Sequence, residues 1–241
     1  MDKKKVRDSK NYKLVELKSP LSYFKKFWLY IWYDDSIGSY IANFAFAYVF
    51  IKFLLFPVLG LLLGTSFPIV AIVTGSMEHK VVQGSICNNK IIASGVTSLD
   101  EDEWWDHCGN YYVDNFNLTQ DDFKNFEYSN GLDIGDVLIL KGSEPENIEI
   151  GEVLIFIPQD RNFYLTKGPV IHRVVNKWKD EDGKFHFQTK GDHNSKSFEN
   201  FENDIIEDNV LAVSAVRIPY LGYVKIVLTN VIFFVSGYGG I

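Results

Sequence analysis

Positive charge is scarce over most of the chain. Residues 65–241 contain fourteen lysines and arginines against twenty-six aspartates and glutamates, a formal charge of −12, whereas residues 1–64 carry ten against five. An acidic region of this kind repels a polyanion, so the composition argues against nucleic acid as a partner. The 241 residues, 46% of them hydrophobic, are enough for one large domain or two small ones with an adequate core.

Cysteine is equally scarce, since the chain has only Cys87 and Cys108. His79 and His107 are nearby in the sequence, but the four residues do not have the spacing of a zinc site. We therefore favour a disulfide over free thiols or a metal site, and nothing in the sequence implies a cofactor. In the loop-entropy model, a bridge over about twenty residues would stabilise this segment by roughly 3 kcal/mol.

One apolar run is long enough to cross a membrane. Residues 41–64 (IANFAFAYVFIKFLLFPVLGLLLG) contain fifteen Ile, Leu, Val or Phe residues and a single charge, Lys52. Twenty-four helical residues reach about 36 Å, and the apolar residues outweigh the cost of one central lysine. The run is too long and too far from Met1 for a cleaved signal sequence. We predict a transmembrane helix over residues 38–64.

The charges on either side of this segment predict its orientation. Nine lysines and arginines precede residue 38, whereas residues 65–79 have none. The positive-inside rule therefore places residues 1–37 in the cytoplasm and residues 65–241 outside. Within the first segment, residues 20–35 (PLSYFKKFWLYIWYDD) are aromatic and amphipathic. This pattern is typical of a helix at the membrane interface, or of one packed on protein.

The region outside the membrane is predicted to be a mainly β domain over residues 65–222. It has short runs of Val, Ile, Phe and Tyr between turn signals, and no helical periodicity of comparable strength. These runs are DVLIL, GEVLIFIP, VIHRVV, KFHFQTK and VLAVSAVRIPY. Residues 80–131 are too long for a plain loop, so we interpret them as an inserted subdomain. The apolar tail, residues 223–241, is either membrane-associated or a last strand.

Ser76 follows the apolar segment closely, in IVTGSMEHK (72–80). A serine hydroxyl is a poor nucleophile and needs a base that accepts its proton, usually with a third group that orients the base. In VIHRVV, a period of two places His172 on one strand face with Val170 and Val174. Taken alone, this pattern is more typical of a buried structural histidine than of a catalytic one.

A predicted hairpin brings an acidic residue toward His172. DEDG (180–183) connects the strand of His172 to KFHFQTK. With a two-residue loop the numbers of two residues paired across the hairpin would add up to 365, and with a four-residue loop to 363. His172 would then face residue 193 or residue 191. Either register places GDHN (191–194) beside His172, with Asp192 within one residue of direct opposition. His186 is expected on the solvent face.

These motifs together resemble the type I signal peptidases of the archaeal and endoplasmic-reticulum branch. SFPIVAIVTGSMEH is similar to the strand that carries the nucleophile of this family, and GDVLIL and GEVLIFIP resemble the core strands that follow. VIHRVV is similar to the general-base strand, and TKGDHN to the Gly-Asp-Asn-Asn box. The motifs occur in the family's order, interrupted by the insertion, which makes them far more specific than any one motif alone.

The resemblance implies a role for each matching residue. Ser76 would be the nucleophile and His172 the general base, where the bacterial branch has lysine. Asp192 would orient His172. Thr74 would help the Ser76 amide to bind an oxyanion, and Met77 would belong to the substrate-binding region.

Two positions depart from the family pattern. His79 replaces the proline that usually follows Ser-Met-x, and Phe198 stands where many relatives have a second aspartate. Glu199, next to Phe198, is therefore an alternative acid.

The resemblance also implies a function. The chain would be a membrane-bound serine endopeptidase that removes signal peptides from exported precursors through an acyl-enzyme. It would lie in the cell membrane or the endoplasmic-reticulum membrane. Its expected partners are the precursor and the lipid bilayer, with the translocation machinery as a further candidate. Two alternatives are a maturation protease of the same fold with one dedicated substrate, and a non-catalytic tethered domain that binds through the insertion.

Overall fold

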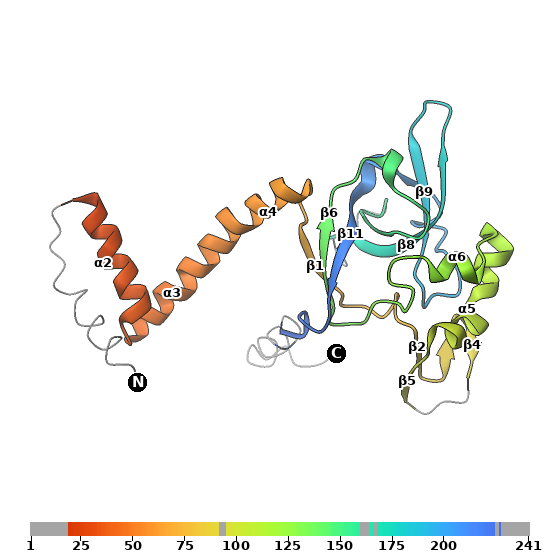
Figure 1. Cartoon of the computed structure of the whole chain (residues 1–241), viewed down its shortest axis with the longest axis horizontal. Coiled ribbons are helices and arrows are strands. Elements are labelled where there is room, and N and C mark those ends of the chain that lie inside the picture. The colour runs from red at the N-terminus through yellow and green to blue at the C-terminus, as the bar shows by residue number, and fades with distance from the viewer. Residues whose placement is uncertain (1–18, 92–94, 160–163, 166–167, 225–226, 228–241) are drawn as a thin grey trace. The chain divides into compact units, whose positions relative to one another are not determined.

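The structure, a computed structural model, describes residues 19–91, 95–159, 164–165, 168–224 and 227 (Figure 1). The chain divides into two compact units, Met1–Leu59 and Gly60–Ile241. The first eighteen residues of the predicted cytoplasmic segment, and most of the predicted tail over 223–241, lie outside the described residues.

The first unit begins with helix α2 (Pro20–Tyr33), which packs on the following helix α3 (Ile37–Phe50). Ser19 caps α2 and exchanges hydrogen bonds with Ser22 in a capping box. Phe27 of α2 meets Phe46 of α3 edge to face, with ring centroids 6.2 Å apart. The segment that the sequence predicts as an interfacial or protein-packed helix is therefore a helix with one side on α3.

A single apolar helix extends from Ile37 to Leu63 and includes α3, a π-helical turn η2 (Ile51–Leu55) and α4 (Phe56–Leu63). Pro57 has no N–H and its ring crowds the preceding turn, which explains the local widening at η2. The most apolar 18-residue stretch of this 27-residue helix has a mean hydropathy of 2.3, and none of that stretch is buried. Within the described residues, this is the one helix long and apolar enough to cross a membrane.

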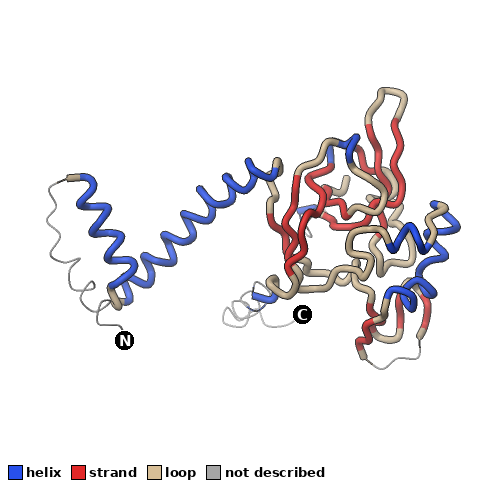
Figure 2. Tube along the Cα trace, in the orientation of Figure 1, coloured by secondary structure: helices blue, strands red, loops and turns tan. Residues whose placement is uncertain are grey.

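The second unit is built on a seven-stranded antiparallel sheet that curls on itself (Figure 2). Its strand order is β1-β6-β11-β7-β8-β9-β10, so β1 and β10 are its edges. The mainly β fold class is therefore confirmed. The strands are β1 (Ile69–Ala71), β6 (Val137–Lys141), β7 (Val153–Phe156), β8 (Val170–Lys179), β9 (Phe185–Lys190), β10 (Ile205–Ile206) and β11 (Val210–Ile218). Short 3-10 turns lie at Pro145–Asn147 and Glu207–Asn209.

Both faces of the central strand β7 are buried. Val153 and Ile155 belong to one apolar cluster, and Leu154 and Phe156 belong to another. Successive side chains of a strand point to opposite faces, so an unbroken apolar run such as VLIF fills two separate cores. This burial holds β8, the next strand in the sheet, in a fixed position.

The segment 80–131 forms a second sheet and two helices. The sheet has the order β4-β3-β2-β5. Its strands are β2 (Lys80–Val82), β3 (Ser85–Ile86), β4 (Asn89–Lys90) and β5 (Val96–Ser98), and the helices are α5 (Glu101–Phe116) and α6 (Gln120–Lys124). The sequence did not predict a helix as long as α5. Its buried stripe is narrow, with Trp104, Cys108 and Tyr112 at four-residue intervals among acidic residues.

A disulfide joins Cys87 to Cys108 and so links the small sheet to α5. Both cysteines belong to an apolar cluster that includes Trp104, Tyr112 and Val175 of β8. The core of the inserted segment is therefore shared with the main sheet.

We expect loss of this disulfide to destabilise the second unit. A Cys87→Ser/Cys108→Ser variant should lose about 3 kcal/mol of unfolding free energy, because the unfolded chain regains the entropy of a loop over 21 residues. Denaturant unfolding of the detergent-solubilised protein, followed by tryptophan fluorescence, measures this loss. Reductant should lower the midpoint of the unsubstituted protein only. Equal midpoints for the two proteins without reductant would contradict the prediction.

Candidate active site

Ser76 and His172, 96 residues apart in the sequence, are in hydrogen-bond contact. The Ser76 Oγ lies 2.9 Å from the His172 Nε2. Ser76 is in the turn after β1, and His172 is on β8 opposite Leu154 of β7. The imidazole is 5% exposed, whereas Ser76 is half-buried and lines a pocket. The structure thus brings the predicted nucleophile and base together.

The loop after β9 holds Ser76 in place. The His193 N–H donates to the Ser76 carbonyl at 2.9 Å. A Cβ on Gly191 would lie 2.8 Å from both the His172 Nε2 and the Ser76 carbonyl oxygen. Because real Cβ contacts are not so short, only glycine permits this close approach of the loop to the pair.

The β8–β9 hairpin does not have either of the predicted loop lengths. The Asp180 N–H donates to the Lys184 carbonyl at 2.9 Å, and Gly183 has φ +83°, so the loop has three residues. A bulge at Val174–Asn176 then shifts the register and sets Arg173 opposite Lys190. The bulge supplies the shift that a four-residue loop would have given, so His172 faces Gly191 and not Asp192.

Glu202, which the sequence analysis did not single out, contacts the second nitrogen of His172. The Glu202 Oε1 is hydrogen-bonded to the His172 Nδ1, and the carboxylate is completely buried. The Phe198 N–H donates to the Glu202 Oε2 at 2.7 Å, and the Thr189 Oγ1 lies 3.4 Å from Oε1. No local pattern in FENFENDIIED distinguishes Glu202 from the other acids of this stretch.

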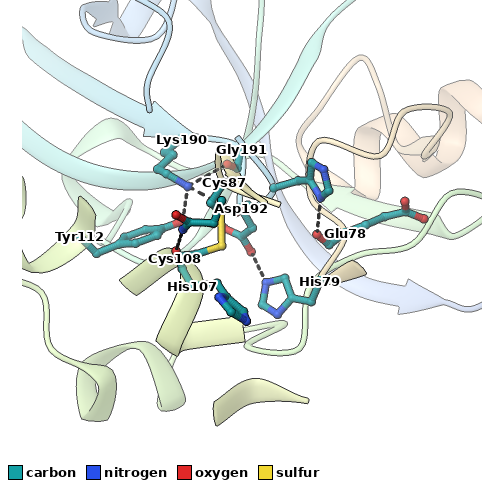
Figure 3. The surroundings of a disulfide bond; sticks show 11 residues. Glu78, His79, Cys87, His107, Cys108, Tyr112, Lys190, Gly191 and Asp192 are labelled. Carbon is teal, nitrogen blue, oxygen red and sulfur yellow. Dashed lines mark hydrogen bonds and ion pairs between the residues drawn. A yellow bond between two sulfur atoms is a disulfide. The ribbon is translucent and has the colours of Figure 1, made fainter. Parts of the chain in front are cut away.

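Asp192 was predicted to orient His172, but its carboxylate does not contact that residue. Its carboxylate instead accepts two hydrogen bonds from Arg173, at 3.0 Å from Nε and 2.7 Å from Nη2. His79, just before the inserted region, and Tyr112 within it approach the same carboxylate, at 3.2 and 3.1 Å (Figure 3). Asp192 lies two residues beyond Lys190, the partner of Arg173, so it shares the side of β8 occupied by Arg173.

Glu199, the predicted alternative acid, is also not at the site. It is exposed and pairs with Lys196 at 3.1 Å. Thr74 is exposed too, with its Oγ1 3.5 Å from the Ser76 Oγ. Met77 is 1% exposed and belongs to the apolar core beneath Ser76. Among the described residues, no group of three His, Cys, Asp or Glu side chains has the arrangement of a metal site.

The cluster around Asp192 has strongly perturbed ionisation. Burial by itself would raise the pKa of Asp192, but the Arg173 guanidinium and the His79 hydrogen bond outweigh it and hold this pKa far below its usual range. Burial lowers the pKa of His79 and lowers the pKa of Lys190 to about 8. The Lys190 Nζ donates to the carbonyls of Gly191 and Asp192, at 3.1 and 3.3 Å.

An apolar pocket of about 560 Å³ opens above Ser76 and His172. It lies between β1 with its following turn, and residues 168–172 at the start of β8. Its apolar lining includes Val70, Ile72, Val170, Ile171, Phe198 and Phe201. A hydroxyl bonded to an imidazole, which is bonded in turn to a buried carboxylate, is an arrangement that activates a serine for nucleophilic attack.

Comparison with known proteins gives partial matches to one group. No protein-family model matches the chain. The chain is 27% identical over 100 residues to the signal peptidase complex catalytic subunit SEC11C of Homo sapiens, covering 40% of this chain and 50% of the relative. It is 28% identical over 96 residues to the SEC11 subunit of Plasmodium falciparum, covering 38% and 48% of the two chains. It is 28% identical over 101 residues to that of Colletotrichum graminicola, covering 40% and 55%. The chain spans about half the length of the curated relatives it matches. The predicted resemblance to signal peptidases of the archaeal and endoplasmic-reticulum branch is confirmed.

We expect Lys190 to make the stability of the protein depend on pH in the alkaline range. Its pKa is about 8 when folded and near 10.4 when unfolded, so between these values the unfolded chain binds more protons than the folded one. Stability contributed by this lysine therefore rises with pH, by roughly 2 kcal/mol from pH 8 to pH 10.

Denaturant unfolding at several pH values tests this expectation. The unfolding free energy of the unsubstituted protein, minus that of Lys190→Met, should increase from pH 8 to pH 10. Lys179→Met, which removes an exposed lysine of β8, is the control. A constant difference would show that Lys190 keeps its ordinary affinity for protons in the fold.

Proposed function

We propose that this chain, a relative of signal peptidase catalytic subunits, is a membrane-bound serine endopeptidase that removes signal peptides from exported precursor proteins. The observation that carries the proposal is the hydrogen-bonded series Ser76–His172–Glu202, in which Ser76 and His172 line an apolar pocket. The named relatives support the choice of a peptidase, and the geometry supports a serine mechanism.

In the proposed reaction, the Ser76 Oγ attacks the scissile carbonyl while the His172 Nε2 accepts its proton. Glu202, bonded to Nδ1, holds the tautomer that leaves Nε2 free to accept and stabilises the imidazolium that forms. The imidazolium then gives its proton to the departing amine, and an ester joins the peptide to Ser76. A water molecule, deprotonated by His172, hydrolyses the ester and regenerates the Ser76 hydroxyl.

The tetrahedral intermediate carries a negative oxygen that needs donors. The Ser76 N–H and the Thr74 hydroxyl are the proposed donors, since Thr74 lies beside Ser76 at the open side of the turn. Preorganised donors at this position are typically worth several kcal/mol of transition-state stabilisation.

The proposed substrate is an extended peptide that adds to the sheet at β1. In the part of the chain that the structure describes, this strand is an edge of the sheet and pairs with β6 alone. The Pro68 carbonyl accepts a hydrogen bond from the Leu140 N–H of β6, and Ile72 both donates to and accepts from the residues just before β6. By alternation, the N–H and C=O groups of Ala71 and Val73 point the other way, toward a bound peptide. Residues with small side chains at the cleavage site would fit beside the close-packed turn of Ser76.

The helix Ile37–Leu63 is the proposed membrane anchor, with the amino terminus in the cytoplasm and the β domain outside. Ser76 follows the end of this helix by only thirteen residues, so the anchor would keep the site close to the membrane surface. A signal peptide also ends near that surface after translocation. The lipid bilayer and precursor proteins are therefore the proposed partners, in the cell membrane or the endoplasmic-reticulum membrane.

Ser76→Ala and His172→Ala should each abolish precursor cleavage, with losses on the order of 10³–10⁶ in turnover. His172→Lys should give little rescue, because Glu202 is positioned to hold an imidazole and a longer amine does not reproduce its geometry. Cleavage of a labelled precursor by detergent-solubilised protein is the measurement. Substantial turnover by Ser76→Ala, free of contaminating peptidase, would refute the serine mechanism.

The three acids near the site should differ in effect. Glu202→Gln should lower turnover by roughly 10²–10⁴ while the protein stays folded, because an amide does not stabilise the imidazolium. Asp192→Asn should act mainly on stability, by about 3–5 kcal/mol, because it leaves Arg173 buried and unpaired. Glu199→Gln, on the surface, is the matched control and should leave turnover within about twofold.

Turnover and unfolding free energy, measured on the same preparations, separate these cases. If Glu202→Gln kept full turnover and folded Asp192→Asn lost it, Asp192 would be the acid that serves His172.

A further inference from the structure

One aromatic side chain on the wall of the pocket, Phe198, is exposed. Phe198 is 47% exposed although it lines the pocket. Its ring stacks on that of Phe201, with centroids 5.4 Å apart and planes 20° from parallel. Phe201 is half-buried and packs on the apolar cluster that contains Val170. The outer ring therefore packs on Phe201 while nearly half of the residue remains exposed.

The backbone of Phe198 is held by the same carboxylate that contacts His172. The Phe198 N–H donates to the Glu202 Oε2 at 2.7 Å, and the Phe198 carbonyl accepts from the Glu202 N–H at 2.9 Å. On the Phe198 side, both bonds use backbone atoms only. The ring thus has a fixed place next to the Ser76–His172 pair, and a substitution of its side chain can leave the bonds to Glu202 intact.

The surroundings of this ring suit an aliphatic side chain better than a small or charged one. Val70, Ile72 and Ile171 are further apolar lining residues of the same pocket. Its volume of about 560 Å³ corresponds to roughly 8 Å across, which an extended peptide crosses in two or three residues at about 3.3 Å each. A side chain that covers Phe198 would therefore belong to a residue within three positions of the attacked carbonyl.

We propose that Phe198 is a specificity-determining residue that recognises one aliphatic side chain, of the size of leucine, near the scissile bond. The proposal rests on the proposed function and adds to it. Small residues at the cleavage point would be required by the turn at Ser76, whereas Phe198 selects a larger residue beside them. Covering the open ring removes apolar surface of both partners from water, which favours leucine over serine at that one position.

Peptide binding to the uncleaving Ser76→Ala protein tests the proposal. The probes are fluorescently labelled peptides that carry alanine throughout, with leucine or serine placed singly at each of three positions on either side of the alanine–alanine bond to be cleaved. Fluorescence anisotropy of the full-length protein in detergent gives the dissociation constants. At one position, leucine should bind about tenfold more tightly than serine, in line with the gain from burying a few methylene groups.

Two substitutions of Phe198 in the Ser76→Ala background identify the source of this preference. Phe198→Ala should reduce the leucine-to-serine ratio to within about twofold of one, and Phe198→Leu should retain most of it. Val216→Ala removes a side chain of similar exposure, 50%, from β11 outside the pocket lining and should leave the ratio unchanged. A wild-type ratio near one at every position, or a ratio that survives in Phe198→Ala, would overturn the proposal.

Failure of this inference can be told apart from failure of the proposed function. If the unsubstituted protein cleaves precursors but shows no preference that depends on Phe198, the peptidase function stands and the inference is wrong. If the preference is found but no peptide or precursor is cleaved, Phe198 still forms a binding site and the proposed catalytic activity is wrong.

Discussion

The buried ion pair between Arg173 and Asp192 is the interaction on which the site depends. Both side chains are completely buried. The remaining guanidinium donors reach the carbonyls of Glu127, Tyr128 and Gly151, at 2.7 to 2.9 Å. A buried charge pair is tolerated only when its other hydrogen-bonding groups are satisfied, and removal of one partner leaves an isolated charge. The pair therefore fixes three separate segments around β8.

One of these segments is the loop that touches both proposed catalytic residues. With Asp192 anchored, Gly191 lies against His172, and the His193 N–H bonds to the Ser76 carbonyl. The N–H of Cys87, one of the two disulfide cysteines, donates to the His193 carbonyl at 3.2 Å. The inserted region is therefore joined to the nucleophile by two successive backbone hydrogen bonds, and it contributes to the structure of the site.

The two buried carboxylates near β8, Glu202 and Asp192, bind different residues because consecutive residues of a strand face opposite sides. His172 faces Glu202, and Arg173 faces Asp192. His79 also joins the second group. Its ring stacks flat on Trp104 of α5 with centroids 4.0 Å apart, which ties the position after Ser-Met-Glu to the insertion. The family that this sequence resembles usually has proline at this position. Here the histidine ring helps to cover Asp192, which gives a structural reason for the replacement.

The sequence by itself determined the features that depend on local composition or on an ordered set of motifs. The apolar segment predicted over 38–64 is the helix Ile37–Leu63, because hydrophobicity and length are local properties. The short apolar runs between turn signals predicted the main strands, and the motif order indicated that Ser76 and His172 belong together. Tertiary structure alone decided the rest. The bulge at Val174–Asn176 sets which residue faces His172, and one residue of register moves a side chain to the other face of a strand. Glu202 reaches His172 through contacts with Thr189 and Phe198, which no local pattern encodes.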